Sequence, residues 1–346
     1  MLTKRPAMAL PKDHPVVKTG KVGVLLINLG TPEATDYWSM RRYLKEFLSD
    51  RRVIDINRLL WWPLLNGIIL TTRPRKSGHA YEQIWNKERN ESPLKTITRG
   101  QAEGVAKAFQ KYPNVIVDWA MRYGFPSIAE RFQALKDQGC ERILIAPLYP
   151  QYSATTTATV LDKTFEHMMK MRWQPALRTL PPYADHPAHI DALAASLKAH
   201  LKTLKWKPDL ILASFHGLPK RYLMEGDPYH CHCFKTARLM AQKAGLKPGQ
   251  MKVVFQSRFG TEEWLKPYAQ DTIEALPGQG IKKIVMMAPG FSSDCVETLE
   301  ELGIGLKETF EENGGEKFSV VPCLNDSDIS VAMLAKLCEE ELQGWI

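Results

Sequence analysis

The sequence predicts an α/β protein with two similar Rossmann-like domains, each a parallel sheet flanked by helices. Short apolar runs alternate with amphipathic helical stretches, as in domains built from βα units. The pattern of the first half of the chain returns in the second half. The length of 346 residues suffices for two domains of ordinary size. Ligands of such folds bind where the strands end, so the polar residues that follow the strands are the candidate site.

Six apolar runs are predicted to be parallel strands. They are rich in Val, Ile and Leu, which is typical of strands that helices cover on both faces of a sheet. The runs are residues 22–29, 115–121 and 142–148 in the first half, and residues 210–215, 252–257 and 283–288 in the second half. Amphipathic stretches separate them, and residues 127–138 and 191–204 are predicted helices.

The two halves resemble each other at their strand ends. The second strand runs into Met121-Arg-Tyr-Gly124 in one half and into Ser257-Arg-Phe-Gly260 in the other. Gly30 and Gly124 are 94 positions apart, whereas Gly217 and Gly260 are 43 positions apart, so the first half carries an insertion. Chance similarity between βα units is the alternative explanation, and internal duplication is the one we adopt.

This pattern predicts the domain boundaries. An N-terminal α/β domain is expected over residues 21–180, with the insertion at about 51–98, and a C-terminal α/β domain over residues 181–328. The last stretch, 329–346, follows the polar cap Asn325-Asp-Ser327 and has apolar residues at helical spacing. We expect it to form a helix that packs back on the first domain.

The insertion is unusual in composition. Residues 61–70, which begin with Trp61 and Trp62, are mostly apolar, and Arg73-Pro-Arg-Lys76 follows them. Such a segment suits an apolar flap over a large flat ligand, or a membrane interface, where Trp and basic side chains favour the headgroup boundary. An ordinary helix packed on its own core is the alternative. We call residues 51–98 the lip insertion.

Composition narrows the function classes. The formal net charge is +8, but Lys and Arg are scattered and do not form the stripe expected of a nucleic-acid binder. The excess of positive charge is compatible with binding of anionic small molecules, with contact to an anionic membrane face, or with a role in solubility alone. The chain lacks a Gly-x-Gly-x-x-Gly motif and a P-loop, which argues against a dinucleotide or nucleotide enzyme.

The lack of a recognisable targeting signal and the irregular cysteine spacing predict a cytoplasmic protein. Residues 1–12 have no apolar core of signal-peptide length, and no run approaches the ~20 apolar residues that span a bilayer. The six cysteines are irregularly spaced, so a disulfide scaffold is not expected. We expect a cytoplasmic protein, with peripheral contact at the inner membrane face as an open alternative. The oligomeric state is not readable from the sequence.

His216 is the first candidate for chemistry. It lies in Ser214-Phe-His-Gly-Leu-Pro219, directly after a predicted buried strand. Free imidazole titrates near pH ~6.5, so at neutral pH such a ring serves as a base or a metal ligand. A purely structural histidine is the alternative.

Asp294, Glu297 and Glu301 form the second candidate. Their spacing of i, i+3 and i+7 places them on one face of an α-helix, as a row of carboxylates that suits a path for a cation. Helix capping would explain Asp294 and Glu297, but not Glu301 two turns further on.

Two further motifs carry polar chemistry with open interpretations. Arg122 and Arg258 occupy matching places in the two halves, where each could clamp an anion or pair with a neighbouring acid. The cluster His230-Cys-His-Cys233 is too closely spaced for a usual zinc hook, and no second hook is evident, so we do not favour a metal there.

Taken together, the motifs of this chain resemble those of the ferrochelatases, which insert ferrous iron into a porphyrin at the end of haem synthesis. The resemblance runs from about residue 22 to about residue 337. It rests on Leu26-Ile-Asn-Leu-Gly-Thr-Pro-Glu33, Met121-Arg-Tyr123, Tyr149-Pro-Gln-Tyr-Ser153, Ser214-Phe-His-Gly-Leu-Pro219, Gly226-Asp-Pro-Tyr229, Gln256-Ser257 and Phe291-Ser-Ser-Asp-Cys-Val-Glu-Thr-Leu-Glu-Glu301.

The resemblance implies two similar domains with a porphyrin cleft between them, and Fe²⁺ and protoporphyrin IX as substrates. It implies that His216 and Glu297 are catalytic, with His216 accepting a pyrrole proton and Glu297 guiding iron or relaying protons. Asp294 and Glu301 would join these two in meeting the metal. The macrocycle would contact Leu29, Trp61, Trp62, Arg73, Arg122, Tyr152 and Trp264, with Arg73 near a propionate.

Departures from the family pattern refine these expectations. Some members have histidine where this chain has Cys295, so a ligand role there is not assigned. Ala154 stands where the animal enzymes have a cysteine for an iron–sulfur cluster, and their cysteine-rich C-terminal extension is absent here. We therefore expect no [2Fe–2S] cluster and no tightly bound cofactor. Leu29 stands where one branch, acting on coproporphyrin, has tyrosine, which favours protoporphyrin.

Three other functions are compatible with parts of the sequence. The first is a chelatase for another tetrapyrrole or metal, such as coproporphyrin III or cobalt. The second is a non-catalytic two-lobed tetrapyrrole-binding protein, although receptors of that type usually carry an export signal. The third, a nucleic-acid binder, would need strongly salt-dependent affinity, and we expect no nucleic-acid partner.

Overall fold

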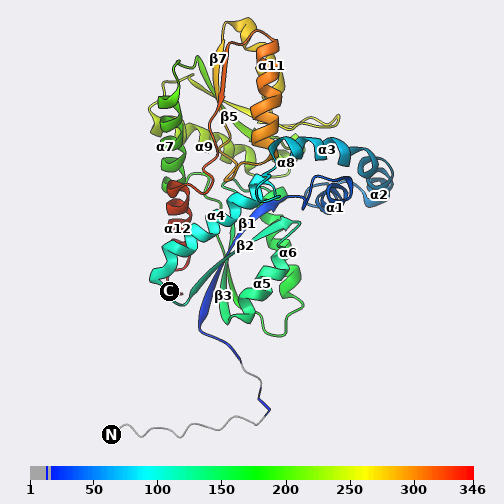
Figure 1. Cartoon of the computed structure of the whole chain (residues 1–346), viewed down its shortest axis with the longest axis vertical. Helices are drawn as coiled ribbons and strands as arrows, with labels where there is room; N and C mark the ends of the chain where they lie inside the picture. Colours follow the sequence, from blue (N-terminus) through cyan, green and yellow to red (C-terminus); the bar gives the residue numbers. More distant parts are fainter. Residues whose placement is uncertain (1–12, 15–16) are drawn as a thin grey trace.

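Two four-stranded parallel sheets form the framework of the protein (Figure 1). The structure, a computed structural model, describes residues 13–14 and 17–346, so the expectation about residues 1–12 lies outside it. The first sheet has the order β2-β1-β3-β4 and the second the order β6-β5-β7-β8. The strands are β1 (Lys21–Gly30), β2 (Val115–Tyr123), β3 (Cys140–Pro147), β4 (Ala176–Thr179), β5 (Leu210–His216), β6 (Met251–Gln256), β7 (Lys283–Met287) and β8 (Lys317–Val320).

The strand order confirms the α/β fold class and agrees with a duplication. In each sheet the first strand along the chain is central, flanked by the second and third, and the fourth lies outside the third. All six predicted strands are present. The sequence did not reveal β4 and β8, because these edge strands have four residues each and none of their side chains is fully buried.

Helices cover the sheets where the amphipathic pattern placed them. The helices of the first half are α4 (Pro93–Ala108), α5 (Ile128–Asp137) and α6 (Thr159–Met168), and those of the second half are α7 (Pro187–Thr203), α8 (Lys220–Met224), α9 (Tyr229–Ala244), α10 (Ala269–Ala275) and α11 (Lys307–Glu312). Both predicted helices are present, as α5 and α7. The Ser127 side chain caps α5 by accepting a hydrogen bond from the backbone of Glu130.

One apolar cluster joins the two sheets. It contains Leu26 of β1, Val105 of α4, Leu197 of α7 and Phe215 of β5, all of them buried. Because burial of apolar surface is the main favourable term in folding, a shared core ties the orientation of the halves to the stability of the whole protein.

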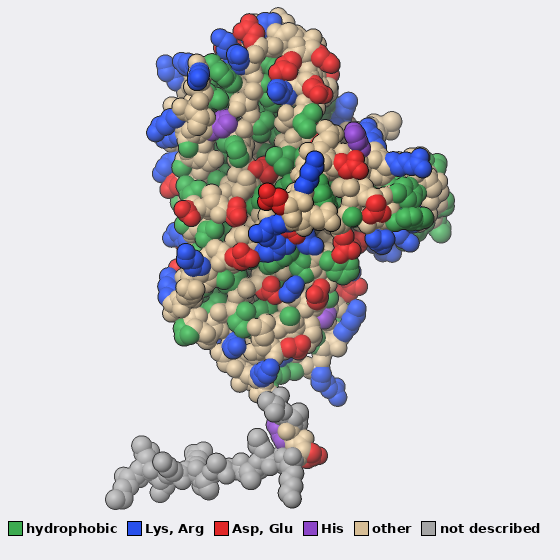
Figure 2. All heavy atoms as spheres, viewed as in Figure 1, with side chains coloured by type: hydrophobic (Ala, Val, Ile, Leu, Met, Phe, Trp, Pro, Cys, Tyr) green, Lys and Arg blue, Asp and Glu red, His purple; other side chains and the backbone are tan. Residues whose placement is uncertain are grey.

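The lip insertion projects from the side of the molecule (Figure 1). It is built from α2 (Arg58–Leu64), the π-helical turn η1 (Leu65–Ile69) and α3 (Leu70–Ile84), and α3 packs against α1 (Tyr37–Leu48). Leu59 is 85% exposed and Leu60 is 72% exposed. Figure 2 shows apolar side chains on this projecting lobe with Lys and Arg at its borders. The alternative of an ordinary helix buried in its own core therefore fits only one side of the segment.

The final helix, α12 (Asp328–Glu341), packs between α4 of the first half and α7 of the second (Figure 1). Arg178 of β4 donates hydrogen bonds to the carbonyl oxygens of Glu341 (2.6 Å) and Gln343 (2.9 Å). Its guanidinium lies 4.3 Å from the centroid of the Trp345 ring. The C-terminal segment thus contacts both halves, and the domain boundaries at 180 and 328 stay predictions.

No helix in the described ranges, 13–14 and 17–346, is long and apolar enough to cross a membrane.

Leu334→Ala tests the shared core. Leu334 of α12 is fully buried in the cluster that joins the halves, so we expect its truncation to lower the free energy of unfolding by about 2–5 kcal/mol. Urea unfolding followed by circular dichroism measures this change. Ile329→Ala, on the same helix but 39% exposed, is the matched control and should cost about 1 kcal/mol or less. Equal losses for the two variants would contradict the shared core.

Candidate active site

His216 is the last residue of β5, the central strand of the second sheet. Its ring is half-buried, and Nδ1 lies 2.7 Å from the carbonyl oxygen of Gly217. A carbonyl oxygen only accepts hydrogen bonds, so Nδ1 carries the proton and Nε2 is left as the basic atom. The imidazole is therefore prepared to accept a proton or bind a metal through Nε2.

Gly217 must be glycine for this strand end to form. A Cβ at this position would lie 2.7 Å from the carbonyl oxygen of Gln256 and 3.0 Å from a ring carbon of Trp264. The His-Gly pair of the sequence motif thus lets β6 and the Trp264 ring approach the backbone directly beside His216.

The acidic segment lies next to the same strand end, through Gln256. Gln256 is the partner of His216 in the register between β5 and β6. Its side-chain amide donates to the backbone carbonyl of Glu297 (2.9 Å) and to the carboxylate of Glu301 (3.2 Å). One residue therefore connects the histidine strand to the segment that carries both glutamates.

The prediction of a single α-helical face for the three acids is wrong. The helix is the π-helix η5 (Glu297–Leu306), and Asp294 lies outside it, two residues before the N-cap Val296. The Asp294 carboxylate accepts hydrogen bonds from Thr298 (2.9 Å) and Asn325 (2.7 Å). The capping alternative is wrong too, because no side chain caps η5, and the Asp294 carboxylate instead binds the Thr298 hydroxyl, the Asn325 amide and the backbone nitrogen of Cys323. π-helical turns occur frequently at functional sites.

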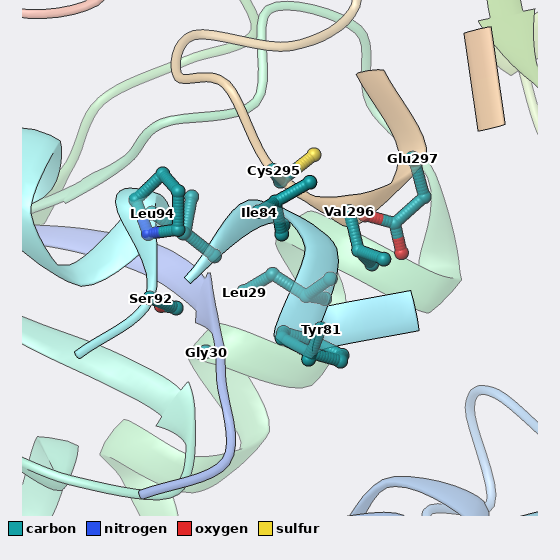
Figure 3. Close-up of a pocket in the computed structure, with 10 residues that line it drawn as sticks. Leu29, Gly30, Tyr81, Ile84, Ser92, Leu94, Cys295, Val296 and Glu297 are labelled. Atoms are coloured by element: carbon teal, nitrogen blue, oxygen red, sulfur yellow. The ribbon is translucent and has the colours of Figure 1, made fainter. Parts of the chain in front are cut away.

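Glu297 lines a small cavity together with Leu29, at the end of β1 (Figure 3). The cavity offers about 10 Å³ of free space, roughly what one water molecule needs. Tyr81 and Cys295 also line it, and His216 does not. Burial first, and then the neighbouring charge of Glu297, raise the pKa of the Cys295 thiol well above its ordinary value. Glu297 therefore faces a small cavity with a largely apolar lining.

Two buried phenols stand near Glu297. Burial raises the pKa of Tyr43 and of Tyr81 well above the ordinary value, and the charge of Glu297 adds to the effect for both. Both phenols therefore stay protonated at neutral pH. The sequence did not single out either tyrosine, because each lies on a helix surface that looks like ordinary core.

A buried polar network joins the end of β1 to the acidic segment across the halves. The Asn28 amide donates to the hydroxyls of Thr98 (3.0 Å) and Ser293 (3.4 Å). Gln101 accepts from Ser293 (3.1 Å) and donates to the carbonyl of Asn325 (2.9 Å). Because buried polar groups are costly unless paired, these bonds specify how the halves meet. We call these five residues the buried polar seam.

Comparison with known proteins gives this arrangement a family. The sequence pattern of the family described as ferrochelatase matches residues 21–342. The chain belongs to the ferrochelatase family. The ferrochelatase of Agrobacterium fabrum is 61% identical over 338 residues, covering 98% of each chain, and that of Rhizobium meliloti is 61% identical over 334 residues, covering 96% of this chain and 98% of the relative. The Brucella ovis ferrochelatase is 56% identical over 333 residues, covering 96% and 95%.

Solved structures share the fold at low sequence identity. SirB from Bacillus subtilis with Fe³⁺ has a TM-score of 0.55 and 11% identity, covering 93% of this chain and 96% of that one. The sirohydrochlorin chelatase SirB of Bacillus subtilis subspecies spizizenii, in complex with cobalt, has a TM-score of 0.52 and 8% identity, covering 94% and 97%. At such identities the likeness shows the two-domain fold alone.

A second set of contacts fixes the loop after β3. The backbone nitrogen of Tyr152 donates to Nδ1 of His232 (3.2 Å). Asp227 accepts hydrogen bonds from the Ser153 hydroxyl (3.0 Å) and the backbone of Ala154 (2.8 Å). Two of the sequence motifs thus bind each other across the halves, and Tyr152 is held, half-buried, at their boundary.

The side chains of the 230–233 cluster diverge. Cys231 is exposed, Cys233 is in the core and His232 serves the Tyr152 loop. Across the part of the chain that the structure describes, no three His, Cys, Asp or Glu side chains form a group that could hold a metal ion. The four predicted metal ligands, His216, Glu297, Asp294 and Glu301, therefore do not form a closed set.

Aromatic contacts link the lip insertion to the histidine strand. The Arg73 guanidinium lies 5.3 Å from the centroid of the Phe259 ring, and Phe259 meets Trp264 edge-on at 4.9 Å. Trp264 is buried against Gly217, so it supports the strand end from inside. Among the predicted porphyrin contacts, Arg73 and Trp62 are exposed, whereas Trp61 is buried and donates to the carbonyl of Leu48 (2.8 Å).

Arg122 was predicted to contact the porphyrin, but the structure shows it buried and paired. It forms an ion pair with Asp50 and donates to the Thr159 hydroxyl (2.7 Å). Burial by itself raises the pKa of the Asp50 carboxyl, but hydrogen bonds from Thr159 and the Arg52 backbone, with the charge of Arg122, outweigh burial and lower this pKa. Asp50 directly precedes the lip insertion, so this pair anchors the insertion to β2.

Asp50→Asn tests this anchor. It leaves the Arg122 charge buried without its partner, so we expect a loss of about 3–5 kcal/mol in the free energy of unfolding at pH 7. The carboxyl pKa is lowered by folding, so its contribution is present above the unfolded pKa of ~3.9 and is lost as pH falls below it. The difference between wild type and variant should therefore shrink in acid.

Asp162→Asn is the matched control for the anchor, because Asp162 pairs with Arg52 at an exposed site. We expect it to cost about 1 kcal/mol or less. Urea unfolding at several pH values measures both variants. A loss for Asp50→Asn no larger than that of the control would show that the pair does not anchor the insertion.

Proposed function

We propose that this protein inserts Fe²⁺ into protoporphyrin IX to form protohaem, with release of two protons, as the last step of haem biosynthesis. The observation that carries the proposal is the pairing, through Gln256, of the His216 strand end with the Glu297 segment in a chain of the ferrochelatase family. Metal insertion needs a base for the pyrrole protons and an acidic group that accompanies the metal. These two residues supply both.

His216 is the proton acceptor in this proposal. The hydrogen bond from Nδ1 to Gly217 leaves the Nε2 lone pair for a pyrrole N–H, and this bond also fixes the orientation of the ring. Insertion through nitrogen and oxygen donors suits transfer, because such donors release Fe²⁺ more readily than a thiolate would. A cleft that binds a bent macrocycle better than a flat one lowers the barrier further.

Glu297 is the acidic partner. The sequence assigned metal contact to three carboxylates, but Asp294 and Glu301 already use their oxygens in hydrogen bonds within the protein. Glu297 has two phenols nearby, Tyr43 and Tyr81, which burial keeps protonated, so neither competes with its carboxylate for a cation. We therefore assign iron guidance or proton relay to Glu297 alone.

The lip insertion is the proposed porphyrin and membrane contact. Protoporphyrin is a flat apolar ring with two carboxylates, and the insertion offers exposed Leu and Trp side chains beside the exposed guanidinium of Arg73. The same apolar surface, bordered by basic residues, suits peripheral contact with the inner membrane face. We propose that the protein acts there without an iron–sulfur cluster or other tightly bound cofactor.

Anaerobic incubation with Fe²⁺ and protoporphyrin IX tests the function. We expect the absorption spectrum to change to that of protohaem, faster than with coproporphyrin III or with Co²⁺ in place of iron. His216→Ala should lower kcat by roughly 10²–10⁴-fold, the contribution of a positioned general base, while porphyrin fluorescence still reports binding. His200→Ala, a histidine of α7, is the control. Normal turnover by His216→Ala, or no conversion by the wild type, would refute the proposal.

A vesicle assay tests the membrane contact. Transfer of each of the exposed side chains of Leu59 and Leu60 from water into lipid would contribute about 2 kcal/mol to membrane binding. Replacing both residues by Asp should therefore weaken binding to anionic phospholipid vesicles at least tenfold. Co-sedimentation measures the bound fraction. Met169→Asp, an equally exposed apolar site after α6, is the control. If all three proteins bind vesicles alike, the lip insertion is not the contact.

A further inference from the structure

The end of β6 holds a strained residue between the two catalytic candidates. Ser257 follows Gln256 and has φ of 63°, the left-handed region that residues other than glycine rarely adopt. Such a conformation is strained and persists only where the surrounding structure holds it. Ser257 therefore needs a partner that fixes its backbone.

Glu301 is that partner. Its carboxylate accepts hydrogen bonds from the backbone nitrogen of Ser257 (2.7 Å) and from the Ser257 hydroxyl (2.5 Å). It also accepts from the amide of Gln256 (3.2 Å). Both carboxylate oxygens of Glu301 therefore accept hydrogen bonds from the turn after β6. This leaves little of their hydrogen-bonding capacity for binding a cation.

The Gln256 amide also holds the start of η5. It donates to the carbonyl of Glu297, while the backbone carbonyl of Gln256 accepts from the nitrogen of Gly217 (2.8 Å). Gln256 is only 2% exposed, and the Ser214 hydroxyl donates to its side-chain oxygen (2.7 Å). Its position is therefore determined from β5, from the turn and from the helix at once.

We propose that Gln256 and Glu301 are positioning residues that set the placement of His216 relative to Glu297, with Glu301 acting by holding Ser257 in its left-handed conformation. The inference rests on the proposed function and gives Glu301 a role other than metal contact. Loss of the Glu301 carboxylate would release the turn after β6. The Gln256 amide could then rotate and would no longer hold the backbone carbonyl of Glu297. A misplacement of about 1 Å at a catalytic group costs up to roughly 10²-fold in rate.

The test compares Glu301→Ala with Glu301→Gln. Alanine removes the acceptors, so we expect kcat to fall by roughly ten- to a hundred-fold, with KM for Fe²⁺ unchanged. Glutamine keeps a carbonyl oxygen for the Ser257 backbone and can donate to the Ser257 hydroxyl, and it gives up only the bond from the Gln256 amide, so kcat should fall by about fivefold or less, the effect of one lost hydrogen bond. A metal ligand or proton relay predicts the opposite: both variants inactive, with a raised KM for Fe²⁺.

A second-site change gives the sharper outcome. Glycine adopts positive φ without strain, so Ser257→Gly in the Glu301→Ala background should restore kcat at least about fivefold, the factor that corresponds to about 1 kcal/mol of backbone strain. Ser257→Ala in the same background is the matched control and should restore nothing. Failure of the glycine to rescue, or equal rescue by alanine, would overturn the inference.

Hydrogen exchange separates this inference from the proposed function. The Ser257 amide should exchange faster in Glu301→Ala than in wild type or Glu301→Gln, whether or not the protein inserts iron. Unchanged exchange in Glu301→Ala would refute the positioning role by itself. If exchange behaves as expected but the wild type does not convert porphyrin, the proposed function fails while the structural assignment of Glu301 stands.

Discussion

The fixed orientation of the two sheets is the constraint on which the rest of this structure depends. One apolar cluster extends from the sheet and helices of the first half to those of the second half. The buried polar seam from Asn28 to Asn325 then specifies one orientation, because any other would leave amides and hydroxyls unpaired in the interior. The strand ends of the two halves therefore meet in one arrangement only.

Chemistry is built onto this frame from both sides. β5 presents the imidazole of His216 with its tautomer fixed by a carbonyl, and the π-helix η5 presents Glu297 to a small cavity that Leu29 and Tyr81 also line. The lip insertion exposes Leu59 and Leu60, and a buried ion pair at Asp50 ties its base to the frame. A rigid scaffold can hold the reactive side chains in place while the exposed apolar lip insertion contacts a large, flat, hydrophobic substrate.

Much of the fold followed from the sequence, because buried parallel strands and amphipathic helices leave strong periodic signals. Six strands and the helices at α5, α7 and α12 were predictable in this way. The short edge strands β4 and β8 were not, since their side chains are only partly buried. The π-helix was also missed, because a pattern of acids at i, i+3 and i+7 presumes α-helical geometry, and Asp294 lies outside the helix altogether.

The sequence by itself determined the fold class, the duplication and the family, since these depend on local patterns and on motifs within short segments. Only the tertiary structure decided what the single side chains do. Arg122, Asp294 and Glu301 are charged residues in site motifs, yet each is bound by protein partners distant along the chain. A charged side chain binds whichever partner folding brings to it, and a linear pattern does not contain that partner.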